Sequence, residues 1–157
     1  MITVSDSASR GERQDLSGPV VREELEKMGC EVDAVLVVPD EIDAIRSCLL
    51  GGINTSNINL VVTTGGTGLA PRDVTPEATA AVIEKNVPGM AELMRLEGMK
   101  VNPRAALSRG LVGVRNKTLI INLPGSVKGV RESLGAIAGI LGHAVEVISG
   151  NTVRCGG

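Results

Sequence analysis

The sequence contains no phenylalanine, tyrosine or tryptophan among its 157 residues. Aromatic side chains are the surfaces on which the bases of single-stranded nucleic acids stack, so recognition of that kind is excluded. A purine or pterin ligand would have to be held by backbone, aliphatic and polar groups. The core must be filled by valine, isoleucine, leucine, methionine and alanine.

An excess of either charge is also missing. The chain has 16 Lys and Arg against 18 Asp and Glu, a formal net charge of −2. Proteins that bind nucleic acid through its phosphates carry a basic surface, so we expect no nucleic-acid partner. No run approaches the ~18 consecutive apolar residues of a membrane span, and no basic segment followed by an apolar one opens the chain. We expect a cytoplasmic protein without a membrane partner.

Metal ligands of the soft kind are few. The three cysteines are Cys30, Cys48 and Cys155, and His143 is the single histidine. The cysteines lack the CxxC spacing of zinc sites, so we interpret them as free thiols of a reducing cytosol. His143 lies within an apolar helical pattern, which disfavours a Ser-His-Asp hydrolase.

The length fits one domain spanning residues 1–157, which would bury about 70% of the surface of the unfolded chain. With 43% hydrophobic and 22% charged residues, the composition is that of an ordinary globular protein. The first residues are strand-like, so we expect the natural N-terminus to lie a little further upstream.

The first half of the chain alternates strand-like and helical patterns. The strand-like runs are residues 1–4, 31–38 and 60–63. A helix with Pro19 at its first position follows the first run, and a helix closed by Gly51-Gly52 follows the second. After the third run, Thr75 can cap a helix that has Pro76 at its first position. Three successive strand-helix units predict a parallel sheet.

The second half predicts helices, a hairpin and a final long helix. The helical patterns are residues 88–99 and 102–110. Strand-like runs at 111–114 and 118–123 are separated by Arg115-Asn116-Lys117, which predicts an antiparallel hairpin at one edge of the sheet. The final helix carries one apolar stripe that should lie against the sheet: Val130, Leu134, Ile137, Leu141, Val145 and Ile148.

A glycine-rich loop follows the third strand-like run. Gly65, Gly66 and Gly68 allow positive φ angles and close backbone approach, and their N–H groups could cradle phosphate oxygens. Threonine hydroxyls at 63, 64 and 67 also favour an anion site. The loop matches neither GxGxxG nor GxxxxGK[ST], so a purely structural turn remains the alternative interpretation.

Polar residues follow each predicted strand. They are Ser5-Asp6-Ser7, Pro39-Asp40-Glu41, the glycine loop with Asp73, and Pro124-Gly125-Ser126 with Lys128. Ligands of open α/β sheets bind outside the carboxyl ends of the strands, so we expect these four loops to form one cleft. Each aspartate alone could be a solvated residue, and Asp40 and Thr75 could be helix caps.

Three carboxylates near a phosphate loop suggest a magnesium site. Mg²⁺ prefers oxygen ligands and bridges carboxylates to substrate phosphates, so Asp6, Asp40 and Asp73 fit nucleotidyl or phosphoryl transfer. Among the basic residues, Lys128 is the best candidate to face an anionic ligand. The others are Arg72, Arg104, Arg109 and Arg131, and for Arg104 and Arg109 a solvated surface role is an equally good interpretation.

Residues 63–77, from Thr63-Thr64-Gly65-Gly66 to Pro76-Glu77, closely resemble the molybdopterin-binding family. That family includes molybdopterin adenylyltransferase and the gephyrin G domain. Further matches cover nearly the whole chain: Val4-Ser5-Asp6, Asp15-Leu16-Ser17-Gly18, Val38-Pro39-Asp40-Glu41, Val87-Pro88-Gly89, Leu107-Ser108-Arg109 and Asn122-Leu123-Pro124-Gly125-Ser126. Ser7, Arg13-Gln14 and Met90 depart from residues common in the family.

The resemblance implies a three-layer α/β/α fold with a mostly parallel sheet, an antiparallel edge hairpin and helices on both faces. It implies a homo-oligomer, a trimer or a hexamer, that uses Mg²⁺ and ATP to adenylylate molybdopterin with release of pyrophosphate. Asp40 and Asp73 would be the catalytic carboxylates and the metal ligands. The other ligand-binding residues would be Ser5, Asp6, Thr64, Gly65, Gly66, Thr67, Gly68, Pro124, Gly125, Ser126 and Lys128. The alternatives are a non-catalytic paralogue that binds a pterin or nucleotide, and a scaffold module.

Overall fold

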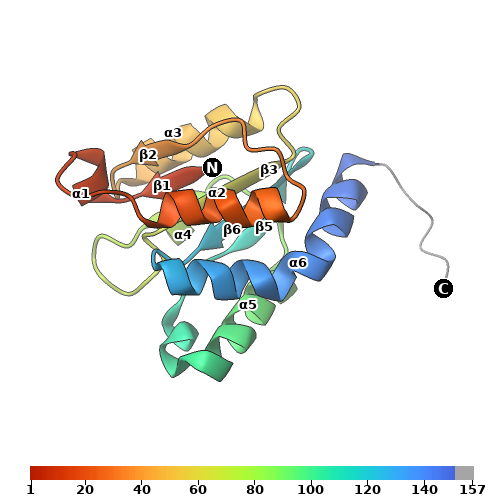
Figure 1. Ribbon diagram of the computed structural model, residues 1–157. Helices are drawn as coiled ribbons and strands as arrows, with labels where there is room; N and C mark the ends of the chain where they lie inside the picture. Colours follow the sequence, from red (N-terminus) through yellow and green to blue (C-terminus); the bar gives the residue numbers. More distant parts are fainter. Residues whose placement is uncertain (151–157) are drawn as a thin grey trace.

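The computed structural model describes residues 1–150 and is built around one six-stranded sheet (Figure 1). The strands are β1 (Ile2–Val4), β2 (Leu36–Val38), β3 (Leu60–Thr64), β4 (Lys85–Asn86), β5 (Val112–Arg115) and β6 (Thr118–Leu123). They lie in the order β2-β1-β3-β6-β5-β4. The strands β2, β1, β3 and β6 are parallel to one another. Strand β5 pairs antiparallel with β6, and β4 pairs antiparallel with β5. The predicted parallel sheet with an antiparallel edge is therefore confirmed.

The centre of the sheet is the β3–β6 pair, in which Leu60 lies opposite Leu119 and Thr64 opposite Leu123. All six residues of β6 are buried. Parallel strands are covered by helices on both faces, which explains why these segments are continuous apolar runs instead of alternating patterns.

Helices cover both faces of the sheet and enclose two separate cores. The helices are α1 (Asp6–Ser9), α2 (Ser17–Lys27), α3 (Ile42–Ile53), α4 (Thr75–Ala80), α5 (Pro88–Val101), the 3₁₀ helix η1 (Pro103–Leu107) and α6 (Val127–Ser149). One core packs α2, α5 and α6 against the sheet, with Val21, Met94 and Leu134 among its buried residues. The other packs α3 and α4, with Leu49 and Ala78. The fold is the expected three-layer α/β/α arrangement.

The final helix, α6, lies on the sheet through the predicted stripe. Val130, Leu134, Ile137 and Leu141 are buried, and Val145 and Ile148 are partly buried against the same core. Ser126 caps its first turn and Gly150 ends it in the left-handed conformation. Its last turns extend past the rest of the molecule in Figure 1. In residues 1–150 it is the one helix long and apolar enough to cross a membrane, a test that core helices of soluble proteins also pass.

Several predicted boundaries are wrong. The second strand covers Leu36–Val38 instead of 31–38, because β2 is an edge strand whose pairing ends with the three-residue β1. Helix α3 continues through Gly51-Gly52 to the buried Ile53, so the glycine pair does not close it. Helix α2 begins at Ser17, which places Pro19 beyond its first position. The short helix α1 and the edge strand β4 were not predicted.

Candidate active site at the carboxyl ends of the parallel strands

Residues from four strand-end loops meet in one pocket of about 280 Å³. Its wall contains Ser5 after β1, Asp40 after β2, the glycine loop with Asp73 after β3, and Gly125 after β6. The predicted convergence of the four loops is thus confirmed. Because the parallel strands end at the same edge of the sheet, side chains far apart in sequence line one cavity.

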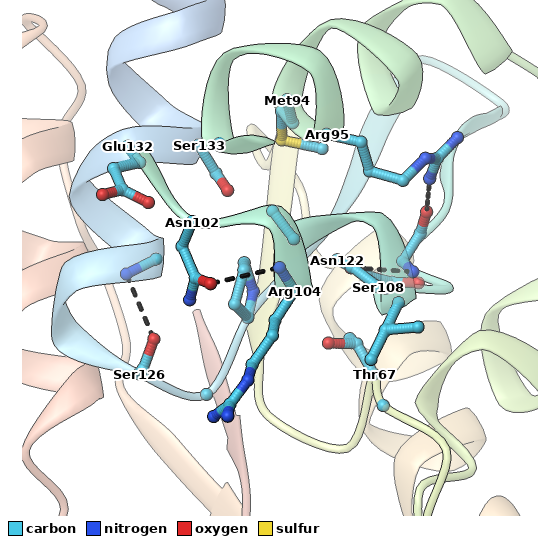
Figure 2. Close-up of a pocket in the computed structure, with 18 of the residues that line it drawn as sticks. Thr67, Met94, Arg95, Asn102, Arg104, Ser108, Asn122, Ser126, Glu132 and Ser133 are labelled. Atoms are coloured by element: carbon cyan, nitrogen blue, oxygen red, sulfur yellow. Dashed lines mark hydrogen bonds between the residues drawn. The ribbon is translucent and has the colours of Figure 1, made fainter. Parts of the chain in front are cut away.

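A larger pocket of about 440 Å³ adjoins the first (Figure 2). Thr67 and Gly68 of the glycine loop line it, as do Pro124, Ser126 and Lys128 of the last turn before α6. Most of the remaining wall comes from α5, η1 and α6, and Asn122 of β6 also contributes. Both pockets share Gly66, Asp73 and Gly125, so the glycine loop is the partition between two adjoining cavities.

The glycine loop is held in a conformation that side chains would disrupt. Gly65 has φ of 100° and Gly66 has φ of 62°. A Cβ atom on Gly65 would collide with the carbonyl oxygen of Val4, and one on Gly66 with the hydroxyl of Thr75. The backbone of the loop therefore reaches the cavities without intervening side chains.

Two threonine hydroxyls fasten this loop to its surroundings. Thr64 donates to the carbonyl oxygen of Pro124 at 2.7 Å, and Thr75 donates to that of Gly65 at 2.9 Å. Thr64, a predicted ligand-binding residue, is buried and lines neither pocket, so it joins two loops instead of facing a ligand. The predicted capping role of Thr75 is wrong, because Val74 occupies the N-cap of α4.

Asp6 and Asp40 are tied to each other through their backbones. The Asp6 N–H donates to an Asp40 carboxylate oxygen at 2.8 Å, and the Asp40 N–H donates to Asp6 at 3.1 Å. Arg72 binds both carboxylate oxygens of Asp6, at 2.8 and 3.0 Å. That bond lowers the pKa of Asp6, and Asp6 lines neither pocket. Asp40 is not a helix cap, since Glu41 is the N-cap of α3.

The surroundings of Asp40 disfavour the ionised form of its carboxyl group. Burial raises its pKa, and the nearby charges of Asp6 and Asp73 raise it further. The Asp6 N–H and the charge of Arg72 lower it, but they do not outweigh these effects, so the ionised form is short of compensating positive charge. A cation placed beside Asp40 would supply that charge.

Three aspartates line the smaller pocket: Asp15, Asp40 and Asp73. The Asp15 carboxylate already accepts from the Thr3 hydroxyl and from the N–H groups of Ser17 and Gly18, which leaves Asp40 and Asp73 as the candidate metal ligands. Mg²⁺ commonly takes one or two carboxylates and completes its shell with water and substrate phosphates, so this pair fits a magnesium ion. A site made of three carboxylates is not supported. Arg72 already engages Asp6, and residues 1–150 contain no group of three or more His, Cys, Asp or Glu side chains placed to hold a metal.

Two residues that line the pockets were not predicted from the sequence. Asn122 lines the larger pocket and is buried, and Asp15 lines the smaller one while accepting from the N–H groups of Ser17 and Gly18 at 3.0 and 2.9 Å. The Asp-x-Ser-Gly pattern at a helix start was the available signal for Asp15.

Arg109 is not a solvated surface residue, because it bonds the glycine loop. Arg104 lines the larger pocket, where Figure 2 shows its side chain between Ser126 and Thr67.

Comparisons with known proteins agree with this geometry. Residues 1–143 match the family model described as a probable molybdopterin binding domain. A molybdopterin adenylyltransferase of Helicobacter pylori is 44% identical over 156 residues, which are 98% of this chain and 89% of that protein. The Drosophila melanogaster molybdenum cofactor synthesis protein cinnamon is 42% identical over 149 residues, and the chain spans only 25% of it.

A solved structure is similarly close. The crystal structure of the molybdopterin biosynthesis enzyme MoaB from Thermus thermophilus superposes with a TM-score of 0.90 at 52% sequence identity. The match covers 95% of this chain and 94% of that one.

Proposed function

Because the chain belongs to the molybdopterin-binding domain family, we propose that it is a molybdopterin adenylyltransferase of molybdenum cofactor biosynthesis. In this reaction a phosphate oxygen of molybdopterin attacks the α-phosphorus of ATP. The new oxygen–phosphorus bond replaces the bond to the bridging oxygen, and pyrophosphate leaves. Adenylylation thereby prepares molybdopterin for molybdate insertion.

The observation that carries the proposal is the partition between the two pockets. A nucleotidyl transfer needs two substrates side by side, with their phosphates meeting at one point. The adjoining cavities of about 280 and 440 Å³ share Gly66, Asp73 and Gly125, which supports the glycine loop as that meeting point. Backbone N–H groups of a glycine-rich loop are suited to bind phosphate oxygens.

The side chains at the partition divide into acidic and basic groups. Asp40 and Asp73 would hold Mg²⁺, which when bound would act as a Lewis acid toward the substrate phosphates and offset the charge of the leaving pyrophosphate. Lys128 and Arg104 line the larger pocket and would bind anionic groups of a substrate there. Ser5 and Ser126 would add hydroxyl contacts, although each already accepts a backbone hydrogen bond at the start of a helix.

The direct test is to incubate the purified protein with molybdopterin, ATP and Mg²⁺. We expect an adenylylated pterin by mass spectrometry and an equal amount of pyrophosphate. Asp73→Asn should abolish both, whereas Asp43→Asn should not, because Asp43 is 89% exposed on α3 and lines neither pocket. Calorimetric binding of ATP or pterin without pyrophosphate release would instead identify a non-catalytic paralogue.

We also propose that the protein acts in the cytoplasm as a homo-oligomer, a trimer or a hexamer, of one domain per chain. An exposed apolar surface supports assembly: only 22% of the most apolar stretch of α6 is buried inside the protomer. Gly135, Gly139 and Gly142 lie on this helix, and a Cβ atom on any of them would meet nothing within 4 Å. A second copy could approach such a surface closely.

A further inference from the structure

Arg109, which the sequence offered either as a ligand-facing residue or as a solvated one, holds the partition between the pockets. The three side-chain nitrogens of Arg109 each donate to a different residue. Nε binds the carbonyl oxygen of Gly68 at 2.7 Å, Nη2 binds that of Asp73 at 2.6 Å, and Nη1 binds the carboxylate of Glu77. Its backbone N–H also donates to the carbonyl oxygen of Thr67 at 2.9 Å.

These bonds enclose the segment that presents Asp73. Between the two carbonyls held by Arg109, residues 69–72 form an exposed loop closed by bonds between Ala70 and Asp73. The Asp73 N–H donates to the Ala70 carbonyl at 2.9 Å, and the Ala70 N–H donates to the Asp73 carboxylate at 2.8 Å. A Cβ atom on Gly68 would lie 2.8 Å from that carboxylate. The position of the Asp73 carboxylate therefore depends on both ends that Arg109 ties together.

We propose that Arg109 is a positioning residue: it fixes Gly68 and Asp73 relative to each other and so places the Asp73 carboxylate for the metal-dependent step. This inference rests on the proposed adenylyl transfer. Arg109 itself lines neither pocket, so it acts through Asp73 and not on a substrate.

An arginine is required at this point by geometry. The planar guanidinium presents donors in several directions at once, whereas a lysine ammonium is a compact charge on a flexible stem. The charge matters too, because Glu77 in the first turn of α4 completes the contact and its pKa is lowered by the bond with Arg109. The three acceptors come from the two ends of the loop and from the helix that follows it.

The same residue connects the partition with the larger pocket. Arg109 follows directly after η1 and Ser108, and this segment lines the larger pocket through Arg104, Leu107 and Ser108. Whatever ligand orders that segment would also steady Arg109 and, through it, Asp73. Binding in the larger pocket should accordingly favour the arrangement of Asp73 in the smaller one.

The test compares Arg109→Lys with a matched control, Arg115→Lys. Both arginine side chains are 35% exposed, and Arg115 likewise donates to a backbone carbonyl, that of Val82, and lies near a glutamate. Hydrogen exchange of the ligand-free proteins should be faster in residues 68–75 of Arg109→Lys and unchanged there in Arg115→Lys. Turnover should fall about 10- to 100-fold in Arg109→Lys, with little change in KM for ATP.

Equal exchange and equal turnover in the two variants would overturn the proposal. If Arg109→Lys does not fold, Glu77→Gln takes its place. This variant weakens one of the three contacts and should cause the same changes at smaller amplitude. An unchanged exchange rate and turnover in Glu77→Gln would also overturn the proposal. Absence of adenylylated product from the wild-type protein would reject the proposed function alone, because the exchange comparison still measures the hold of Arg109 on the loop.

Discussion

Gly65 and Gly11 both have positive φ, 100° and 71°, but their surroundings differ. A Cβ atom on Gly11 meets nothing within 4 Å, whereas one on Gly65 collides with the backbone of β1. We predict that Gly11→Ala costs about 1 to 2 kcal/mol of unfolding free energy from the left-handed conformation alone. Gly65→Ala should cost clearly more and displace the glycine loop. Urea denaturation of the two variants measures the difference, and equal losses would contradict it.

The raised pKa of Asp40 leads to a prediction about pH. Asp6→Asn removes a negative neighbour whose charge raises the pKa of Asp40, so the pKa of Asp40 should fall. Because Asp40 must be ionised to bind a cation, any remaining activity of Asp6→Asn should persist to lower pH than that of wild type. Carboxyl ¹³C NMR of Asp40 in the free protein measures the same shift directly. Asp43→Asn is the control, and an upward shift in Asp6→Asn would contradict the assignment.

At the residue scale, the sequence predicted which side chains gather but not what engages them. Ser5, Asp40, Asp73 and Gly125 could be grouped because each follows a strand. The fate of Asp6 depends on Arg72, 66 residues further on, and this pairing has no local pattern. The contacts of Arg109 could not be predicted either, since its acceptors are two backbone carbonyls and a glutamate in other segments.

At the scale of elements, Asn122 joins the strands to the helix behind the glycine loop. Its amide nitrogen donates to the hydroxyls of Thr63 and Thr79 at 3.0 and 2.9 Å, and its oxygen accepts from the Leu111 N–H at 3.1 Å. We predict that Asn122→Leu lowers the unfolding free energy by about 3 kcal/mol, because it leaves buried polar groups without partners.

Asn86→Leu is the matched control for Asn122→Leu. Asn86 is exposed on the edge strand β4, so its replacement should change stability by about 0.5 kcal/mol or less. Urea unfolding of both variants, followed by circular dichroism, makes the comparison. Similar losses would show that Asn122 is no more than an ordinary strand residue.

The type of an element could be predicted where its apolar pattern extends over many residues. The ends of an element could not be predicted where tertiary contacts decide them. The stripe of α6 is read directly from helical spacing, and β6 from its continuous apolar run. Helix α3 passes through Gly51-Gly52 because Ile53 is buried beyond them, a contact that outweighs glycine propensity. Residues 31–35 have strand-like composition, but β1 offers them no further partner.

At the scale of the whole molecule, a substitution at the glycines of α6 can distinguish an isolated protomer from an assembly. Gly139 is exposed, and Gly139→Glu improves helix propensity, so it should not destabilise the chain itself. If a second copy packs there, the buried charge should break the assembly. We predict that wild type sediments at three or six times the 16.2 kDa chain and Gly139→Glu at a smaller mass.

Gly51→Glu is the control for that experiment, because Gly51 is also an exposed helical glycine with nothing within 4 Å of a Cβ atom. It should sediment as the wild type does. A wild-type monomer at micromolar concentration would contradict the proposed oligomer. An unaltered mass for Gly139→Glu would instead place the contact surface elsewhere.

The position of β1 has a consequence for how the chain is made. Residues 2–4 form an inner strand, and their partners are residues 36–38 and 63–64. The strand β3 in turn pairs with β6, whose last paired residue is Leu123. During synthesis, β1 leaves the ribosome before the strands that it pairs with, so the sheet can close only after residue 123 has been made. Contacts so distant in sequence slow folding, so the nascent chain passes through a stage with exposed apolar strands that chaperones would bind.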